Sequence, residues 1–244
     1  MKENKYDNAV FFEKYSAMPR SVGGLESAGE WQTFRSLLPV LDGKKVLDLG
    51  CGFGWHCRYA REQGAASVTG IDLSDNMLQR AREMTNDPLI EYIQMPIEDI
   101  SFGEGEFDTV ISSLAIHYVE QFGDLCRRVN DCLKNGGQFV LSVEHPVFTA
   151  LAAQDWHYSQ SGEKLHWPVD GYHLEGARTA RFLGENVVKY HRTLSTYLNV
   201  LLESGFTLAK ISELQPTTEM LEQDPAWHEE VRRPMFLLLS VFKA

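Results

Sequence analysis

Residues 46–54 read Val46-Leu47-Asp48-Leu49-Gly50-Cys51-Gly52-Phe53-Gly54, an apolar run that enters a loop with glycine at every second position. Alternate glycines remove the Cβ atoms that would block a ligand, and they permit positive φ angles. Residues 55–62 contain no helix breaker before Gly64, so the sequence predicts a helix with a glycine C-cap there. A strand, a glycine loop and a helix in this order indicate that backbone atoms approach a nucleotide-like ligand.

The neighbours of this loop indicate which ligand it binds. The dinucleotide fingerprint requires a third glycine where this chain has Trp55, because that glycine allows the helix to pack closely on the strand. Asp48, two residues before the first glycine, would repel a pyrophosphate and would suit a positively charged ligand. S-adenosylmethionine carries ammonium and sulfonium groups, so we predict it as the cofactor. An ordinary tight turn and an NAD-dependent oxidoreductase stay as alternatives.

An acidic residue follows at the spacing that ribose binding needs. Residues 65–72 predict a second strand that ends in Asp72, about twenty residues beyond the loop, where such folds use a carboxylate to accept the ribose hydroxyls. Ser74 can cap the helix that follows, so Asp72 is not needed as its cap. Asp72 is therefore the side chain most directly predicted to bind the ligand.

Strands and helices continue to alternate along the chain. Further strands are predicted at 91–95, 107–113, 138–143, from Phe206, and at 235–242. A helix through Leu133 closes at 135–137, and a later helix over 194–202 ends at Gly205. This alternation predicts an α/β fold, a doubly wound and mostly parallel seven-stranded sheet with helices on both faces. Its ligands bind beyond the carboxyl ends of the strands.

Composition agrees with a single domain over residues 1–244. The chain has 244 residues, 43% of them hydrophobic, which is enough for one large core. Its net charge is −11 and it has no basic run, so a nucleic-acid partner is not expected. No apolar run approaches about eighteen residues, so we expect a cytoplasmic protein without a membrane segment or signal peptide.

The cysteines do not indicate a metal site. Cys51, Cys57, Cys126 and Cys132 lack Cys-x-x-Cys spacing. We therefore expect them to be small buried residues in a reducing compartment.

The loop and the acid together resemble a known family. The spacing of Asp48, Gly50, Gly52 and Gly54 resembles the first motif of the class I S-adenosylmethionine-dependent methyltransferases, and the resemblance extends from about 46 to 205. It implies the strand order 3-2-1-4-5-7-6, with strand 7 antiparallel. Segments 113–118 and 142–146 look like the small-molecule branch named methyltransferase type 11, and no Asn-Pro-Pro-Tyr motif of amino-methylating enzymes follows the fourth strand.

The resemblance also implies a cofactor site at the strand ends. Loop backbone would hold the methionine part, Leu73 and Met77 would line the adenine, and Ser113 and Leu114 would present main chain to the ammonium group. Pro96 stands where family members commonly have Asp, so adenine contacts would come from the residues after it. The implied cofactor-binding residues are Asp48, Gly50, Cys51, Gly52, Gly54, Asp72, Leu73, Met77, Ile97, Glu98, Ser113 and Leu114.

The chemistry requires alignment more than it requires reactive groups. Methyl transfer from a sulfonium is an in-line displacement with an activated donor, so no metal is needed. A base helps if the acceptor is a hydroxyl or an amine, and histidine has a suitable pKa. His145, after the fifth strand, is the preferred candidate and His117, after the fourth, is the second. A structural role for either histidine stays as the alternative.

Two segments outside the motifs would build the acceptor side. Residues 1–40 predict an N-terminal helical arm, which in this branch often folds over the cofactor. Residues 146–192 form an insertion between the fifth strand and the next helix, and long insertions are usually lids or binding loops. Its Trp156, Trp167 and Tyr172 would suit a planar substrate, or would bury themselves in a subdomain core or a homodimer contact.

These observations lead to one hypothesis and its rivals. We expect a methyltransferase that acts on O or N of a small organic molecule and releases S-adenosylhomocysteine. A protein or RNA methyltransferase and a non-catalytic S-adenosylmethionine-binding protein are the alternatives.

Overall fold

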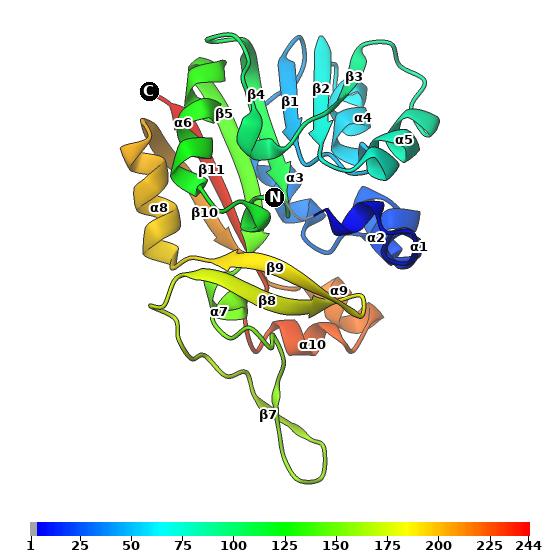
Figure 1. Ribbon diagram of the computed structural model, residues 1–244, viewed down its shortest axis with the longest axis vertical. Helices are drawn as coiled ribbons and strands as arrows, with labels where there is room; N and C mark the ends of the chain where they lie inside the picture. The colour runs from blue at the N-terminus through cyan, green and yellow to red at the C-terminus, as the bar shows by residue number, and fades with distance from the viewer. Residues whose placement is uncertain (1–3) are drawn as a thin grey trace.

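A seven-stranded sheet forms the centre of the molecule in a computed structural model that describes residues 4–244 (Figure 1). Its strand order is β10-β11-β5-β4-β1-β2-β3. The strands of this sheet are β1 (Lys45–Leu49), β2 (Ser67–Asp72), β3 (Ile90–Gln94), β4 (Phe107–Ser113), β5 (Leu133–Glu144), β10 (Phe206–Glu213) and β11 (Phe236–Lys243).

The predicted topology is confirmed. Strands β1 to β5 pair in parallel, whereas β11 runs antiparallel to both β5 and β10. In order along the chain, β10 and β11 are the sixth and seventh strands of the sheet, so the order is 3-2-1-4-5-7-6. The last strand enters between the fifth and the sixth because it brings an apolar run, residues 236–239, into the middle of the sheet.

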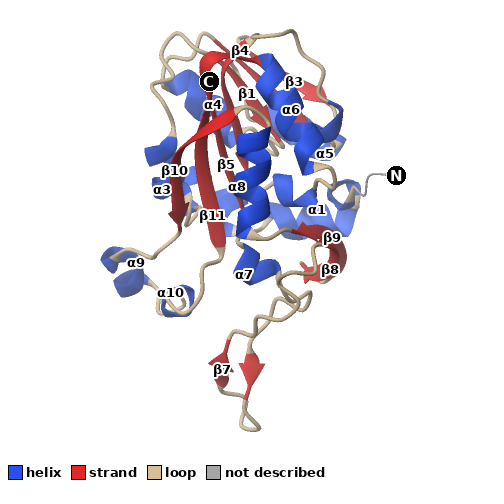
Figure 2. Ribbon diagram, turned by 90° about the vertical axis from the view of Figure 1, so that its left-hand side faces the viewer, coloured by secondary structure: helices blue, strands red, loops and turns tan. Residues whose placement is uncertain are grey.

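Helices cover both faces of the sheet (Figures 1 and 2). Alternate residues of β1 enter opposite layers: Val46 packs with α3, α4 and α5, while Leu47 and Leu49 belong to the core under α6 and α8. Successive side chains of a strand point to opposite faces, so both faces of the sheet are buried. The helices are α1 (Ala9–Ser16), α2 (Pro19–Val22), α3 (Trp31–Leu37), α4 (Trp55–Glu62), α5 (Asp75–Glu83), α6 (Phe122–Cys132), α7 (Pro146–Thr149), α8 (Leu194–Glu203), α9 (Thr218–Gln223) and α10 (Trp227–Glu230).

Helix α6 is shorter than the sequence predicts. It ends at Cys132, and Leu133, the expected last helical contact, begins β5 and pairs with Phe107 of β4. Leu133 is fully buried in the same core layer as the helix. The prediction was wrong here because an apolar residue at this boundary fits the buried face of a helix and a buried strand equally well.

The expected arm and insertion both have defined structure. The arm, apart from its first three residues, which lie outside the described part, contains α1, α2 and α3 with the short 3-10 turns η1 (Lys5–Asp7) and η2 (Leu25–Ser27). The insertion contains α7 and two hairpins, β6–β7 (His157–Tyr158 and Lys164–His166) and β8–β9 (Gly176–Phe182 and Glu185–His191). In Figures 1 and 2 the β8–β9 hairpin crosses below the sheet, while β6–β7 projects away from the body.

A second long connection was not anticipated. Residues 214–235, between β10 and β11, carry α9 and α10 and reach the base of the insertion. There the guanidinium of Arg233 lies 4.5 Å from the ring centre of Trp167 and 4.8 Å from that of Phe148. Trp156 packs edge-on against Trp167, with ring centroids 5.4 Å apart. These two tryptophans therefore belong to a small subdomain core, the alternative that the sequence left open.

No helix within residues 4–244 has both the length and the hydropathy needed to cross a bilayer.

The β8–β9 hairpin is fastened to the sheet by a buried ion pair. Lys189 of β9, 3% exposed, donates to the carboxylate of Glu144 at the end of β5. Gln154 donates to the other oxygen of that carboxylate over 2.9 Å. The insertion is thus held in place by charges that water does not screen.

We expect Lys189→Met to lower the free energy of unfolding by about 3 kcal/mol, because it leaves Glu144 buried without its counter-charge. The double variant Lys189→Met, Glu144→Gln should recover most of that loss. Urea unfolding measures both. Lys210→Met, on exposed strand β10, serves as the control, and a Lys189→Met protein as stable as the wild type would contradict the assignment.

Candidate cofactor and acceptor site

Four backbone N–H groups of the glycine loop are hydrogen-bonded within the protein. The N–H groups of Gly50 and Cys51 both donate to the carbonyl of Ile71 over 2.9 Å. The N–H of Gly52 donates to the carboxylate of Asp72 over 2.9 Å, and that of Gly54 donates to the Cys51 carbonyl over 2.8 Å. A pyrophosphate needs such N–H groups to point at it. The loop is instead arranged for a ligand that brings its own donors, such as an ammonium group.

Close approach to the loop is possible at Gly52. Its φ is +52°, and a Cβ placed on it would meet no atom within 4 Å. The conformation favours glycine, and the space beside it is open. At Gly50, by contrast, a Cβ would lie 2.4 Å from the side chain of Ala115, so that glycine serves packing.

Asp72 connects the loop to the end of β2. One carboxylate oxygen accepts from the Gly52 N–H and the other from the Ser74 N–H, both over 2.9 Å. Burial raises the pKa of Asp72, and the hydrogen bonds from Ser74 and Gly52 oppose that rise. Ser74 caps α5 by accepting from the Met77 N–H, as predicted. Asp72 is therefore not the residue that caps α5.

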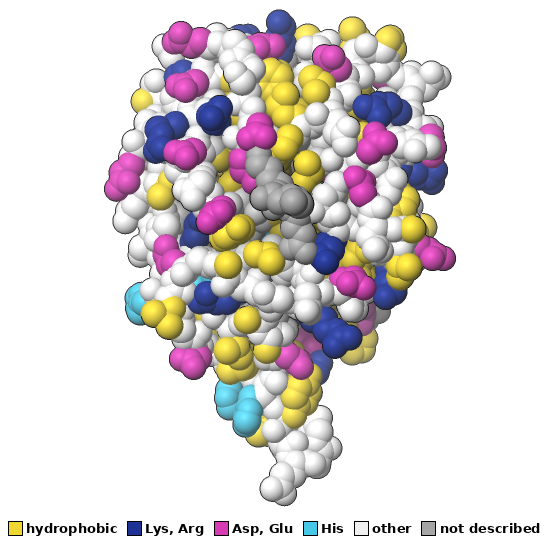
Figure 3. Space-filling model, viewed as in Figure 1, with side chains coloured by type: hydrophobic (Ala, Val, Ile, Leu, Met, Phe, Trp, Pro, Cys, Tyr) yellow, Lys and Arg dark blue, Asp and Glu magenta, His cyan; other side chains and the backbone are white. Residues whose placement is uncertain are grey.

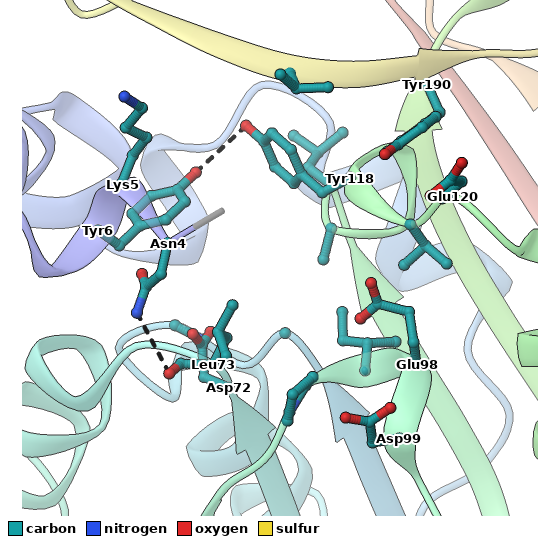
Figure 4. Close-up of a pocket in the computed structure, with 18 of the residues that line it drawn as sticks. Asn4, Lys5, Tyr6, Asp72, Leu73, Glu98, Asp99, Tyr118, Glu120 and Tyr190 are labelled. Atoms are coloured by element: carbon teal, nitrogen blue, oxygen red, sulfur yellow. Dashed lines mark hydrogen bonds between the residues drawn. The ribbon is translucent and has the colours of Figure 1, made fainter. Parts of the chain in front are cut away.

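A cavity of about 650 Å³ lies at the carboxyl ends of the parallel strands. Figure 4 shows Asp72 and Leu73 on one side of it, with Tyr118 and Tyr190 opposite. Most of the predicted cofactor residues line this cavity. They are Gly50, Gly52, Asp72, Leu73, Met77, Ile97, Glu98, Ser113 and Leu114.

Three predicted cofactor residues do not line this cavity. Asp48 is 1% exposed, lies behind the loop and accepts a hydrogen bond from the Cys57 thiol over 3.2 Å. Gly54, in a left-handed conformation, is the N-cap of α4. Cys51 lines a smaller neighbouring cavity. Their positions support the loop from behind and from the side.

Leu114 has an unusual backbone conformation for its type. Its φ is +53°, and its N–H donates to both the carbonyl and the hydroxyl of Ser142, over 3.0 and 3.1 Å. A left-handed non-glycine residue costs free energy and is kept where its surroundings hold it. Residue 114 is therefore held in a fixed shape at the edge of the cavity.

The roof of the cavity comes from segments distant in sequence. Asp7 accepts hydrogen bonds from the Ser74 hydroxyl and the Asn76 N–H, which fixes the N-terminal segment over α5. The hydroxyls of Tyr6 and Tyr118 lie 3.4 Å apart at the cavity wall (Figure 4). Burial raises the pKa of both phenols, so both are neutral at pH 7.

The sequence did not assign these tyrosines a role. Tyr6 and Tyr118 are 112 residues apart, and Tyr190 comes from the insertion. Tyr118 lies in the 113–118 segment and Tyr190 among the aromatic residues of the insertion. Proximity of this kind leaves no local pattern in a sequence, so only the fold could bring the three together.

The two predicted base candidates lie away from the cavity lining. His145 accepts from the Val147 N–H over 3.0 Å as the N-cap of α7, and its Nε2 lies 2.9 Å from the Glu213 carboxylate. His117 is 3% exposed, and burial lowers its pKa to about 4. Among the described residues that line the cavity there is no histidine. A base role for either histidine stays a prediction.

No group of three or more His, Cys, Asp or Glu side chains within the described chain could hold a metal ion. Cys51, Cys57, Cys126 and Cys132 are free thiols and buried.

The buried Asp48 carboxyl generates a pH-dependent prediction. Burial raises its pKa from 3.8 to about 7. The folded protein thus binds a proton more tightly than the unfolded chain, so this group's contribution to stability falls as pH rises from about 4 to about 7. We expect Asp48→Asn to remove this pH dependence. Between about pH 4 and pH 7, the free energy of unfolding of the variant should rise relative to that of the wild type by on the order of 3 kcal/mol. Chemical denaturation of both proteins at several pH values measures this difference in the free energy of unfolding. A difference that does not vary with pH would contradict the raised pKa of Asp48.

Known proteins resemble this chain in sequence and in fold. A family model described as "Methyltransferase domain" matches residues 47–141. A Listeria monocytogenes crystal structure assigned as an S-adenosylmethionine-dependent methyltransferase is 51% identical, covers 91% of this chain and 99% of its own, and superposes with a TM-score of 0.86. An S-adenosylmethionine-dependent methyltransferase from Mesorhizobium loti is 44% identical over 90% of this chain and all of its own, with a TM-score of 0.85.

A curated relative from Methylococcus capsulatus, a tRNA U34 carboxymethyltransferase, is 27% identical over 81% of this chain. The chain spans 55% of that relative's length.

The two solved structures match about nine-tenths of the chain, and the glycine loop suits a cationic donor rather than a pyrophosphate. The chain belongs to the class I S-adenosylmethionine-dependent methyltransferases, in the branch with the type 11 methyltransferase domain.

Proposed function

We propose that this protein transfers the methyl group of S-adenosylmethionine to an oxygen or nitrogen atom of a small, neutral or cationic organic molecule. The observation that carries the proposal is the cavity of about 650 Å³, which is large enough for the cofactor and a small acceptor together. S-adenosylmethionine supplies an activated methyl group when bound. The residues of this chain bind the cofactor, orient the acceptor and exclude water from the cavity.

The cofactor-binding roles inferred from the resemblance form part of the proposal. The Asp72 carboxylate accepts the ribose hydroxyls, and Leu73 and Met77 contact the adenine. Ile97 and Glu98 meet the adenine edge. The backbone of Ser113 and of the constrained Leu114 faces the ammonium group. Each of these residues lines the cavity, which supports the assignment.

The charge of the cavity wall supports the acceptor class. The wall carries five carboxylates and two cations, and a polyanion such as tRNA would need the opposite balance. Among described residues on the face shown in Figure 3, Lys and Arg side chains are interspersed with Asp and Glu side chains rather than gathered in one patch. The charged lining residues are Asp72, Glu98, Asp99, Glu120, Asp124, Lys5 and Arg128.

We propose that alignment of the acceptor, more than proton abstraction, is the contribution of the protein. Tyr6 and Tyr118 present neutral hydroxyls to the cavity, and these can orient an acceptor N–H or O–H by hydrogen bonding. In β9, Tyr190 hydrogen-bonds Glu120 and lines the same cavity. The lid role of residues 146–192 belongs to this proposal, because β9 supplies part of the cavity wall.

The proposal is tested by following a tritiated methyl group from S-adenosylmethionine into a cell extract separated into small-molecule, protein and RNA fractions. We expect label in the small-molecule fraction. Label in RNA would favour the activity of the tRNA relative, and label in protein would favour a protein methyltransferase. Tight cofactor binding without label in any fraction would indicate a binding protein.

We expect Asp72→Ala to weaken the binding of S-adenosylhomocysteine by about 1–3 kcal/mol, because the ribose loses charge-assisted hydrogen bonds. Isothermal titration calorimetry measures the affinity. Asp75→Ala, an exposed carboxylate in the first turn of α5, is the matched control. If the Asp72 variant binds S-adenosylhomocysteine with unchanged affinity, the assignment of Asp72 to the ribose is contradicted.

The tyrosine and histidine hypotheses give opposite outcomes. We expect Tyr118→Phe to lower kcat about tenfold, since one orienting hydrogen bond is lost, while the affinity for the cofactor stays unchanged.

We expect His145→Ala to change kcat little, because the imidazole lies outside the cavity lining. A roughly 10²–10⁴-fold loss of kcat in His145→Ala, with normal cofactor affinity, would establish the base role predicted from the sequence instead.

A further inference from the structure

Three tyrosines form one wall of the large cavity. Tyr6 and Tyr15 come from the N-terminal arm and Tyr118 from the 3-10 turn η4 (Ile116–Tyr118) after β4, and all three line the cavity. The rings of Tyr15 and Tyr118 stand at 86° and 85° to the ring of Tyr6, with centroids 5.2 and 6.5 Å from it. We call these three residues the tyrosine wall. Rings at right angles enclose a bound group from more than one side, beside the paired hydroxyls of Tyr6 and Tyr118 (Figure 4).

The tyrosine wall is suited to positive charge. The face of an aromatic ring attracts cations, and a phenol oxygen offers lone pairs. Burial is the main cause that raises the pKa of all three phenols, and the nearby Asp72 carboxylate adds to the rise at Tyr6 and Tyr15. Arg20, whose charge acts on Tyr15 and Tyr118, is already paired with a buried carboxylate over 2.6 Å. The wall therefore consists of neutral, electron-rich groups.

An unpaired hydrogen-bond acceptor belongs to the same cavity lining. The Nδ2 group of Asn4 donates to the Asp7 carboxylate and to the Leu73 carbonyl, which identifies Oδ1 as the other end of the amide. This Oδ1 atom is buried and has no hydrogen-bond partner in the described chain. Buried polar groups in native proteins are nearly always paired. A ligand that brings an N–H or O–H donor would satisfy it.

The neutral phenols separate amine acceptors from alcohol acceptors. An alcohol has to give up a proton as it attacks, and a neutral phenol does not accept one. The free base of an amine attacks with its own lone pair. The nitrogen–carbon bond then forms while the carbon–sulfur bond breaks and leaves its electron pair on sulfur. The positive charge thus passes from the sulfonium to the nitrogen, and electron-rich groups around that nitrogen stabilise it as it develops.

We propose that the methyl acceptor is an amine that reacts as its free base, and that the tyrosine wall holds the ammonium group formed on its nitrogen. The inference rests on the proposed function and narrows the acceptor atom to nitrogen. The products are the methylated ammonium ion and neutral S-adenosylhomocysteine, so the charges balance without a base from the protein. An amine that still carries hydrogen also has an N–H donor for the Oδ1 of Asn4.

The test compares two probes of the same shape and different charge. Choline carries a trimethylammonium group, and 3,3-dimethyl-1-butanol has carbon in place of that nitrogen. Titration calorimetry measures the binding of each probe to the protein saturated with S-adenosylhomocysteine. We expect choline to bind about tenfold more tightly than the neutral probe. Equal affinities, tighter binding of the neutral probe, or no detectable binding of choline would overturn the inference.

Variants assign the preference to the rings. We expect Tyr6→Leu and Tyr15→Leu each to reduce the preference for choline about threefold or more, whereas Tyr6→Phe keeps the ring and should keep the preference. Tyr158→Leu, at a tyrosine that is 41% exposed on the β6–β7 hairpin, is the matched control and should bind both probes as the wild type does. If both leucine variants bind S-adenosylhomocysteine normally and keep the full preference, the tyrosine wall is not the ammonium site.

The outcomes also separate this inference from the proposed function. The comparison of the two probes on the wild type needs no variant, so it decides the matter even if a leucine variant unfolds. A wild type that does not bind S-adenosylhomocysteine contradicts the proposed function itself. A wild type that binds it and labels the small-molecule fraction, but does not prefer choline, leaves the proposed function standing and overturns only the amine inference.

Discussion

The hydrogen bonds that tie the glycine loop to the end of β2 are the constraint on which the site depends. The Ile71 carbonyl accepts from Gly50 and Cys51, and the Asp72 carboxylate accepts from Gly52. These bonds fix the loop shape and also limit its chemistry, because the N–H groups of Gly50, Cys51 and Gly52 are not available to a phosphate. The same carboxylate faces the main cavity, so one side chain links the shape of the loop to ligand binding.

Contacts between segments distant in sequence build the side of the cavity opposite the glycine loop. Its wall comes from the N-terminal segment, the turn after β4 and the inserted hairpin, which meet through long-range contacts (Figure 4). Arg192, 6% exposed, donates to the carbonyls of Val119 and Glu120 and so connects the end of the hairpin to that turn. The Lys189–Glu144 pair secures the same hairpin to β5. Buried charges thus position the hairpin side of the cavity, while the sheet positions the glycine loop on the other side.

Much of the cofactor half could be predicted, because its residues follow strand ends at fixed spacing. Asp72 was located from the alternation of strands and helices, whereas Leu73 and Leu114 came from the resemblance to the methyltransferase family, and all three line the cavity. The prediction placed Asp48 at the ligand, yet it lies behind the loop with its carboxyl bonded to Cys57, because odd and even residues of a strand face opposite layers. The two histidines were predicted as bases from the usual pKa of histidine and from their positions after strand ends. In the fold both are buried, and their rings contact backbone N–H groups and, for His145, the Glu213 carboxylate.

By itself, the sequence determined the alternation of strands and helices, the glycine loop and the acid at the end of the second strand, since hydrophobic periodicity and turn chemistry are local properties of a chain. Only the tertiary structure decided which tyrosines line the large cavity, that Trp156 and Trp167 surround Arg233, and that Arg20 reaches the loop. Those outcomes depend on segments tens to more than a hundred residues apart. Their proximity follows from how insertions and termini pack on the finished sheet, which no local pattern encodes.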